Sequence, residues 1–259
     1  MTKRQRQRLI RLVMYALFFG VIALLVAVAD WPVIRRNFFN VEIAREMFPR
    51  VLTVAARNTV FYTFLAFVFG LGLGLLLALM RLSTIGPYRW FARIYIEIFR
   101  GLPALVTIFL VGLGIPIAFR VRWNILIYIT LGLGLVAAAY MAETIRAGIE
   151  GVPKGQMEAA RSLGMSYSRA MLSIVIPQGF RIIIPPLTNE LVLLIKDTSL
   201  LFVLGTTPAT VELLKFGRQI LDRRANATPL IVIALVYLAI TVPLTQLVAM
   251  LERRNRRAR

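Results

Sequence analysis

Residues 59–80 read TVFYTFLAFVFGLGLGLLLALM, an apolar run without a charged side chain. At a rise of about 1.5 Å per residue, a helix of this length crosses a hydrocarbon core of about 30 Å. Five more apolar runs lie at roughly 12–29, 94–118, 124–144, 182–205 and 228–251. The pattern predicts an all-α integral membrane protein with about six transmembrane helices.

The composition agrees with this fold class. Of 259 residues, 59% are hydrophobic, and the mean hydropathy is +0.76, whereas soluble domains are about 45–50% apolar. The chain contains no Cys and no His, which excludes disulfides, thiolate or imidazole metal sites and His general bases. It also contains no Gly-Lys dipeptide and hence no Walker A loop. We therefore expect no enzymatic activity and an energy source on another protein.

The net charge of +19 indicates topology rather than nucleic-acid binding, because the basic residues flank the apolar runs. With six spans, 18 of the 31 Lys and Arg lie on the side of the termini and 10 on the other side. The excess predicts that both termini are cytoplasmic. Ala27-Val28-Ala29 resembles a signal-peptidase site, so cleavage of the first span stays open.

Residues 145–181 form the longest segment expected on the cytoplasmic side. Helix formers over 156–163 precede Gly164, which is placed for a left-handed helix cap. A second helix is expected to start at 166–168 and to be interrupted by Pro177. The segment therefore predicts a short helix–turn–helix across the mouth of the bundle. It either packs into a groove on a partner or is a surface helix that contacts nothing.

Specific spacing distinguishes this segment. Glu158-Ala159-Ala160, Gly164 after three residues, and Ile174 to Pro177 after nine more resemble the EAA motif of ABC-importer permeases, with Ile176 in place of Leu. Flanking stretches resemble the polar amino acid branch of that family over about residues 51–252. They are Phe99-Arg100-Gly101-Leu102-Pro103, Ala139–Glu143, Arg146-Ala147-Gly148, Val152–Gln156 and Ile195–Leu200.

The resemblance implies a coupling helix that docks on a separate ATPase. The ATPase-coupling residues would be Glu158, Ala159, Ala160, Gly164, Ile174 and Pro177. Glu158 would cap or orient the docked helix, the two alanines would permit close approach, and Gly164 would make the turn. ATP and Mg would lie on the partner, with no cofactor in this chain. The expected partners are two ATPase subunits, a second identical or homologous permease, and an extracytoplasmic substrate-binding protein.

The resemblance also divides the chain and places it in the bacterial inner membrane as a multi-pass protein. Residues 1–50 would hold an N-terminal transmembrane helix and outer segment, 51–252 the ABC importer transmembrane domain, and 253–259 a basic cytoplasmic tail.

Polar residues within the spans are costly and therefore candidate pathway residues. Glu97 and Arg100 lie three apart and can pair on one helix face, or Arg100 lines a substrate route beside Gly101 and a break at Pro103. Glu143 is expected near the inner interface, where it can pair with Arg146. The proposed substrate pathway comprises Glu97, Arg100, Gly101, Asn189 and Glu190.

Other polar segments are open to two interpretations. A possible outer gate comprises Lys196, Asp197, Thr198 and Ser199, which could equally form a salt bridge and a helix cap. Residues 206–227 are either a solvated outer loop or a contact surface for the binding protein. The glycines at 70 and 74 form a GxxxG motif, expected to serve intramolecular packing rather than a dimer seam.

The sequence thus predicts a permease subunit of an ATP-driven importer that translocates polar amino acids delivered by an extracytoplasmic binding protein. The alternatives are a permease for another small solute and, less favoured, an ion-coupled secondary transporter that uses Glu97, Glu143 and Glu190. Opposite charges on Arg100 and Glu190 favour neither acidic nor basic amino acids as the substrate.

Overall fold

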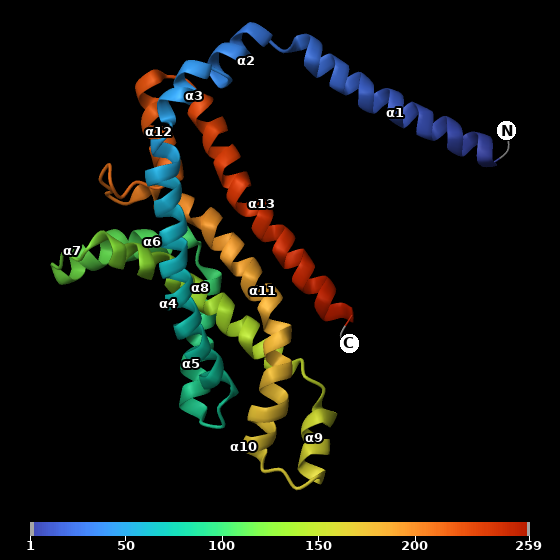
Figure 1. Cartoon of the computed structure of the whole chain (residues 1–259), viewed down its shortest axis with the longest axis vertical. Coiled ribbons are helices and arrows are strands. Elements are labelled where there is room, and N and C mark those ends of the chain that lie inside the picture. Colours follow the sequence, from blue (N-terminus) through green and yellow to red (C-terminus); the bar gives the residue numbers. More distant parts are fainter. Residues whose placement is uncertain (1–2, 258–259) are drawn as a thin grey trace.

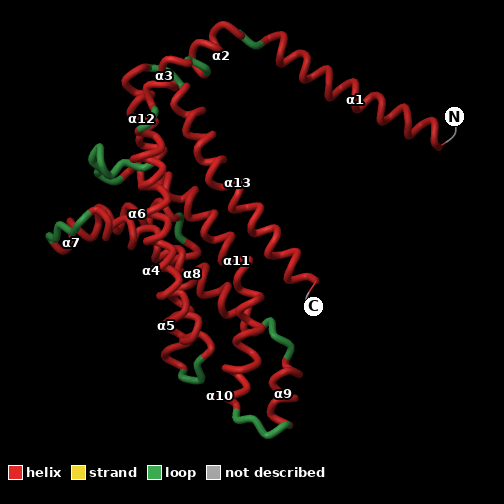
Figure 2. Tube along the Cα trace, viewed as in Figure 1, coloured by secondary structure: helices red, strands yellow, loops and turns green. Residues whose placement is uncertain are grey.

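The computed structural model describes residues 3–257, and this range is helical without any strand (Figures 1 and 2). The long helices are α1 (Lys3–Val28), α4 (Arg57–Leu82), α8 (Ile125–Glu150), α11 (Ile176–Asp197) and α13 (Thr228–Arg257). The shorter ones are α2 (Trp31–Phe38), α3 (Val41–Met47), α5 (Gly86–Gly101), α6 (Ala104–Phe109), α7 (Ile115–Phe119), α9 (Lys154–Ser162), α10 (Tyr167–Ala170) and α12 (Leu213–Arg224). The segments η1 (Val51–Ala56), η2 (Leu110–Gly114) and η3 (Met171–Val175) are π-helical, and η4 (Thr198–Val203) is a 3₁₀ helix.

Membrane-length helices confirm the predicted fold class. Within the described range, five helical stretches are long and apolar enough to cross a membrane: Lys3–Val28, Val51–Leu82, Ile125–Glu150, Tyr167–Val203 and Thr228–Arg253. The bent pair Gly86–Gly101 and Ala104–Phe119 raises the number to six if it is counted as one span. The ends of the expected first and last segments, at residues 1–2 and 258–259, lie outside the described residues.

The centre of the bundle is the α4–α8 pair. Gly70 and Gly74 lie so close to α8 that an added Cβ would approach Ala137 Cβ and Ala138 O at 3.0 Å. The buried side chains of Ala137, Ala138 and Met141 fill the other side of this contact. The GxxxG motif therefore serves packing within the chain, as predicted.

The third expected span, 94–118, is not a straight helix. Helix α5 ends at Gly101, and α6 leaves it at an angle of 105°. Leu102 is extended (φ −86°, ψ 139°), because a residue that precedes proline is disfavoured in the α region. Pro103 also lacks the N–H that would continue the helix, so this span is divided at Leu102 and Pro103.

Pro177, in contrast, does not interrupt its helix. The π-helical segment η3 precedes it, and the N–H of Ile176 donates to Met171 O. The wider turn shifts the hydrogen-bond register before proline enters, so α10, η3 and α11 form one continuous stretch. Pro185 and Pro186 lie inside α11. The expected interruption is therefore wrong, and the helical stretch begins at Tyr167 rather than near residue 182.

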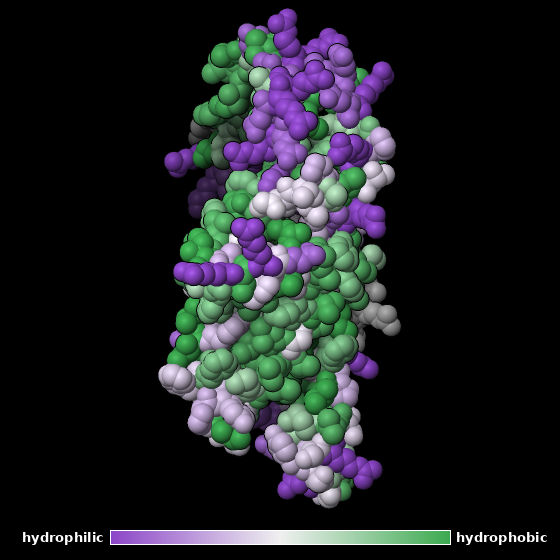
Figure 3. Space-filling view, turned by 90° about the vertical axis from the view of Figure 1, so that its left-hand side faces the viewer, coloured by the Kyte–Doolittle hydropathy of each residue, from purple (hydrophilic) through white to green (hydrophobic). Residues whose placement is uncertain are grey.

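The end of the molecule formed by α2, α3 and α12 is held by polar contacts. Asn226 Nδ2 donates to Arg36 O at 2.9 Å, and the N–H of Asn40 donates to Thr228 Oγ1 at 2.9 Å. Figure 3 shows hydrophilic residues gathered at this end and hydrophobic residues over the middle of the molecule. Residues 213–224 are helical here, so the interpretation of 206–227 as a plain solvated loop is wrong. Helix α1 extends away from the bundle (Figure 1), and its apolar window is not buried.

Candidate functional site

A cavity of about 490 Å³ lies where the break between α5 and α6 faces α8 and α11. The chain bends by 105° at Leu102 and Pro103, and these two residues line the cavity. The lining residues are Arg100, Gly101, Leu102, Pro103, Ala104, Leu133, Val136, Ala137, Tyr140, Glu190, Leu193, Leu194 and Asp197. The walls are mainly apolar, and three charged side chains supply the polar groups, which is the usual composition of a small-molecule site.

Arg100 is the cation of this cavity. Its guanidinium carbon lies 5.4 Å from the centre of the Tyr140 ring, within the range of a cation–π contact. Glu190 of α11 lies within electrostatic range of Arg100. Because Arg100 occupies the last turn of α5, the negative end of that helix also favours its charge.

The cavity therefore holds both signs of charge. Glu190 and Asp197 contribute carboxylates two helical turns apart on α11, and both are only partly exposed. A guanidinium facing carboxylates across apolar walls can bind a zwitterion, because each end of the ligand meets its opposite charge.

The structure brings together part of the predicted pathway. Arg100, Gly101 and Glu190 all line the cavity, and so does Asp197 from the expected gate. Asn189 is exposed and lies outside the lining. Of the other gate residues, Lys196 is exposed, Ser199 is half-buried, and Thr198 is buried with its hydroxyl donating to Ile195 O.

Glu97 has a different partner from the one expected. Its carboxylate lies 3.3 Å from Arg93 Nε on an exposed face of α5. Both Arg93 (four residues before) and Arg100 (three residues after) are helical neighbours of Glu97, so spacing alone could not decide between them. Arg100 instead lies over the Tyr140 ring of α8, so the Glu97–Arg100 pairing is wrong.

Sequence reasoning missed Tyr140 and the apolar walls of the cavity. Tyr140 belongs to a stretch that resembles the family, but an aromatic residue in a span gives no signal of a cation above its ring. Leu133, Val136 and Ala137 recur at helical spacing on α8, yet that pattern is equally typical of core packing.

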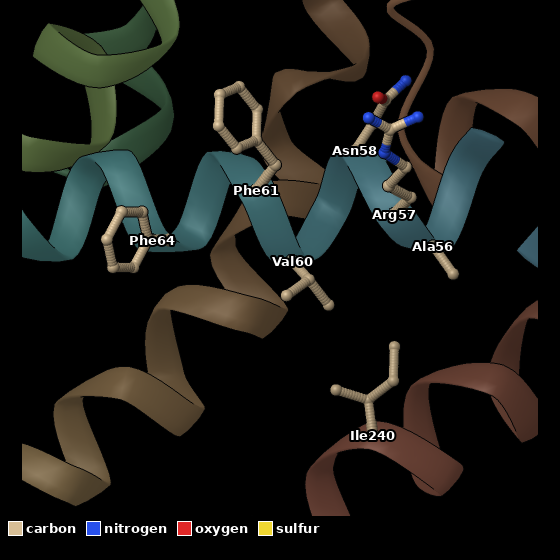
Figure 4. Close-up of a pocket in the computed structure, with 7 residues that line it drawn as sticks. All are labelled: Ala56, Arg57, Asn58, Val60, Phe61, Phe64 and Ile240. Carbon is tan, nitrogen blue, oxygen red and sulfur yellow. The ribbon is translucent and has the colours of Figure 1, made fainter. Parts of the chain in front are cut away.

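A larger hollow of about 800 Å³ lies between the start of α4 and α13 (Figure 4). Figure 4 shows Val60 and Ile240 facing each other across it, with Phe61 and Phe64 along the same helix. Arg57 and Asn58 are its polar lining residues, and the Asn58 amide already donates to Ala209 O and Val211 O. This hollow lacks paired charges, so the smaller cavity is the better candidate for a polar ligand.

The second candidate region is the turn between α9 and α10. Gly164 has φ +86°, as the predicted left-handed cap requires. The N–H of Met165 donates to Ala160 O at 3.1 Å, and that of Gly164 to Arg161 O at 3.0 Å, which together form a Schellman motif. Ser166 then caps α10 through Arg169 N. The connection between α8 and α10 spans residues 151–166, so it is shorter than the expected segment 145–181.

The motif residues face in different directions. Ala160 is buried against the chain itself, whereas Glu158 and Ala159 are exposed. Leu163 is 85% exposed, an unusual environment for a large apolar side chain in an ordered turn. Ile174 is half-buried, and Pro177 is exposed at the start of α11.

Three charged residues pair along α8, near the end from which the chain leads to α9. Arg146 forms ion pairs with Glu143 and Glu150 on α8, and its Nε lies 3.1 Å from Glu143 Oε2. The pairing of Glu143 with Arg146 is thus confirmed.

A buried carboxylate lies at the α12 end of the bundle, apart from the cavity and from the α9–α10 turn. Glu212 is fully buried and caps α12 by accepting hydrogen bonds from the N–H groups of Leu214 and Lys215. Burial raises the pKa of this carboxyl to about 7, although the two backbone donors and Lys215 favour its charged form.

Comparison with known proteins identifies the family. Residues 70–257 match the model described as binding-protein-dependent transport system inner membrane component. The chain is 39% identical over 203 residues to the probable amino-acid ABC transporter permease protein YckA of Bacillus subtilis (strain 168), covering 78% of this chain and 87% of that protein. It is 34% identical over 215 residues to the L-cystine transport system permease protein TcyB of the same organism, covering 82% and 90%.

A solved structure extends this similarity to the fold. The crystal structure of an amino acid ABC transporter with histidines contains a chain that is 34% identical, with a TM-score of 0.74, covering 81% of this chain and 96% of that one. The chain therefore belongs to the family of binding-protein-dependent transport system inner membrane components.

Proposed function

We propose that the chain is the permease subunit of an ATP-driven importer that carries polar amino acids across the bacterial inner membrane. Two features support this assignment: family membership with relatives named as amino-acid permeases, and a cavity with opposite charges on facing helices. In this proposal Arg100 binds the substrate carboxylate, and Glu190 binds its ammonium group. Gly101 leaves space at the broken helix end, where free backbone groups can assist.

The single observation that carries the coupling proposal is the exposed apolar surface at Leu163, next to exposed Glu158 and Ala159. A docked ATPase subunit would cover Leu163 and would approach closely at Ala159. Gly164 and the Schellman turn would hold α9 at a fixed angle to α10. The ATPase would bind ATP and Mg, and its closure would move α9 and the helices attached to it.

The proposed assembly contains two permease chains, identical or homologous, and two ATPase subunits. A substrate-binding protein would dock at the opposite end of the bundle, where α2, α3 and α12 meet. Both termini would be cytoplasmic, an orientation supported by the excess of Lys and Arg on that side.

The test is co-purification of an ATPase with the tagged full chain in mild detergent. We compare the wild type with Leu163→Glu, which adds a charge to the proposed docking surface without touching the core. Ser168→Glu is the matched control, because Ser168 is exposed in the same region and the added charge is equal. We expect the ATPase to be lost from Leu163→Glu only. Equal recovery with both variants, or no ATPase with the wild type, would contradict the docking proposal.

A further inference from the structure

A row of charged residues of alternating sign leads from the cavity to the coupling region. It begins at Glu190, passes through Arg100 of α5, and continues on α8 with Glu143, Arg146 and Glu150. Gly151 then ends α8, and α9 starts three residues later. At about 1.5 Å per residue, the part of the row on α8 spans about 10 Å from Glu143 to Glu150.

The α8 members of the row share one face of the helix. Tyr140, Glu143, Arg146 and Glu150 follow at intervals of three or four residues. The side chain of Arg146 is 23% exposed and that of Glu143 28%, so water screens their charges only partly. Ion pairs at this spacing stabilise isolated helices by small amounts, and a purely local role would end there.

Arg100 extends the row beyond a local role, because it comes from a different helix. No carboxylate of the described residues lies within ion-pair distance of its guanidinium, which instead lies above Tyr140. Glu143 lies one helical turn from Tyr140 on α8 and within electrostatic range of Arg100, and Glu190 lines the same cavity as Arg100. Arg100 therefore lies near two carboxylates, of which one lines the cavity and one belongs to the ion pairs of α8.

A second arginine completes the cluster from α4. Arg81 also lies within electrostatic range of Glu143, and its Nε is buried without a hydrogen-bond partner in the described part of the chain. Glu143 is thus paired with Arg146 and within electrostatic range of Arg81 and Arg100, and the three arginines belong to three different helices. A shift of α8 at its inner end changes the attraction of Glu143 for all three.

We infer that Glu143 and Arg146 are positioning residues that transmit movement of the coupling region to Arg100, and thereby set the affinity of the cavity for the substrate carboxylate. This inference rests on the proposed function. Glu143 can act in this way because its carboxylate is negative and Arg100 is positive. When α8 moves toward the cavity, Glu143 attracts Arg100 away from Glu190. Arg146 holds Glu143 through two hydrogen bonds and links it to Glu150 at the end of the helix.

The experiment uses the assembled importer in proteoliposomes, with this chain, its ATPase and its binding protein. Labelled L-glutamine, L-arginine and L-glutamate serve as separate probes, and the measured quantity is probe transported per ATP hydrolysed. Glu143→Gln is nearly isosteric and removes only the charge. We expect the ratio to fall about tenfold, a typical size for coupling between two sites, while ATP hydrolysis without substrate stays within about twofold. Glu97→Gln is the control, because it breaks an exposed pair on α5 outside the row.

A charge swap separates transmission from local stability. Glu143→Arg combined with Arg146→Glu keeps an ion pair between positions 143 and 146, although it loses the pair with Glu150. The swap presents a like charge to Arg100, so we expect the low ratio to persist. A wild-type ratio in either variant would overturn the inference. If the swap lowers the melting temperature of the purified chain, the transport ratio of Glu143→Gln alone tests the inference. A wild-type importer that hydrolyses ATP but moves none of the probes would instead contradict the proposed function.

Discussion

Helices α9 and α12 are short amphipathic helices at opposite ends of the bundle, yet they differ in how far their apolar residues are buried. Helix α12 buries Leu213, Phe216 and Gly217, whereas α9 buries only Ala160. Just after α9, Leu163 is left 85% exposed. An amphipathic helix that covers its apolar face within the chain needs nothing more for stability. The open side of α9 is where we propose that another molecule docks.

The largest expected effect compares the same substitution in both regions. Leu213→Ala removes a fully buried side chain and should lower the free energy of unfolding by about 2–5 kcal/mol. Leu163→Ala should change it by less than about 0.5 kcal/mol, because the side chain is exposed. Thermal unfolding of the purified chain in detergent measures both. Similar losses from the two variants would show that the α9 end is packed as tightly as the α12 end.

The second prediction concerns pH and Glu212. Its folded pKa of about 7 lies above the ordinary value of 4.5, so between these values the folded chain holds a proton that the unfolded chain has released. The free energy of unfolding should therefore fall as pH rises from about 4.5 through 7, by at most about 3 kcal/mol.

Glu212→Gln removes this titration and serves as the comparison. Its melting temperature should decline less than that of the wild type between pH 5 and pH 8. Parallel pH profiles for the two proteins would contradict a raised pKa at this position. The α9 turn offers no buried carboxylate, so Glu158→Gln should leave the wild-type profile unchanged.

The third prediction compares two glycines of the α9 region. Gly164 has φ +86° and open space around it, whereas Gly155 lies inside α9 at an ordinary φ, also in open space. Gly164→Ala should cost about 1 kcal/mol through left-handed strain. Gly155→Ala should instead stabilise by about 0.4–1 kcal/mol, because alanine fits the helical φ of the first turn and restricts the unfolded chain. Hydrogen exchange of the α9 amides measures both changes, and effects of equal sign would exclude conformation as the cause.

The smallest expected effect lies at the α12 end. Arg224 Nη2 is 2.6 Å from Glu46 Oε2, but both side chains are about half exposed. Glu46→Gln should destabilise by less than about 1 kcal/mol, and the difference should vanish at about 1 M salt. A larger, salt-independent loss of melting temperature would mean that this pair, like Leu213, belongs to the packed part of that end.

Local patterns were sufficient to predict much of this architecture. The apolar runs predicted the helical membrane fold, and the position of Gly164 predicted the turn after α9. The spacing of Glu143 and Arg146 predicted their ion pair. Such features depend on residues within a few positions of one another. The cavity could be anticipated only through Arg100, Gly101 and Glu190, without the aromatic ring that completes the environment of the arginine.

Features that depend on distant contacts escaped prediction. Pro103 and Pro177 look alike in sequence, but a π-helical segment precedes only Pro177, and nothing local indicated it. In the sequence, nothing distinguishes Glu212 from the other charged residues of segment 206–227. Its burial depends on packing between α4, α12 and α13, which the local sequence does not indicate. Glu97 had two eligible arginines, and Arg100 is drawn instead to the Tyr140 ring of a different helix.

The break at Leu102 and Pro103 acts mechanically as a joint with Arg100 near its axis. Helix α5 has 16 residues and is therefore about 24 Å long. A 10° swing about the joint would move the Gly86 end by about 4 Å, while Arg100, within one turn of the pivot, would be displaced far less. Such a lever lets the outlying end of α5 follow a large movement of the assembly while the cavity keeps its cation nearly in place.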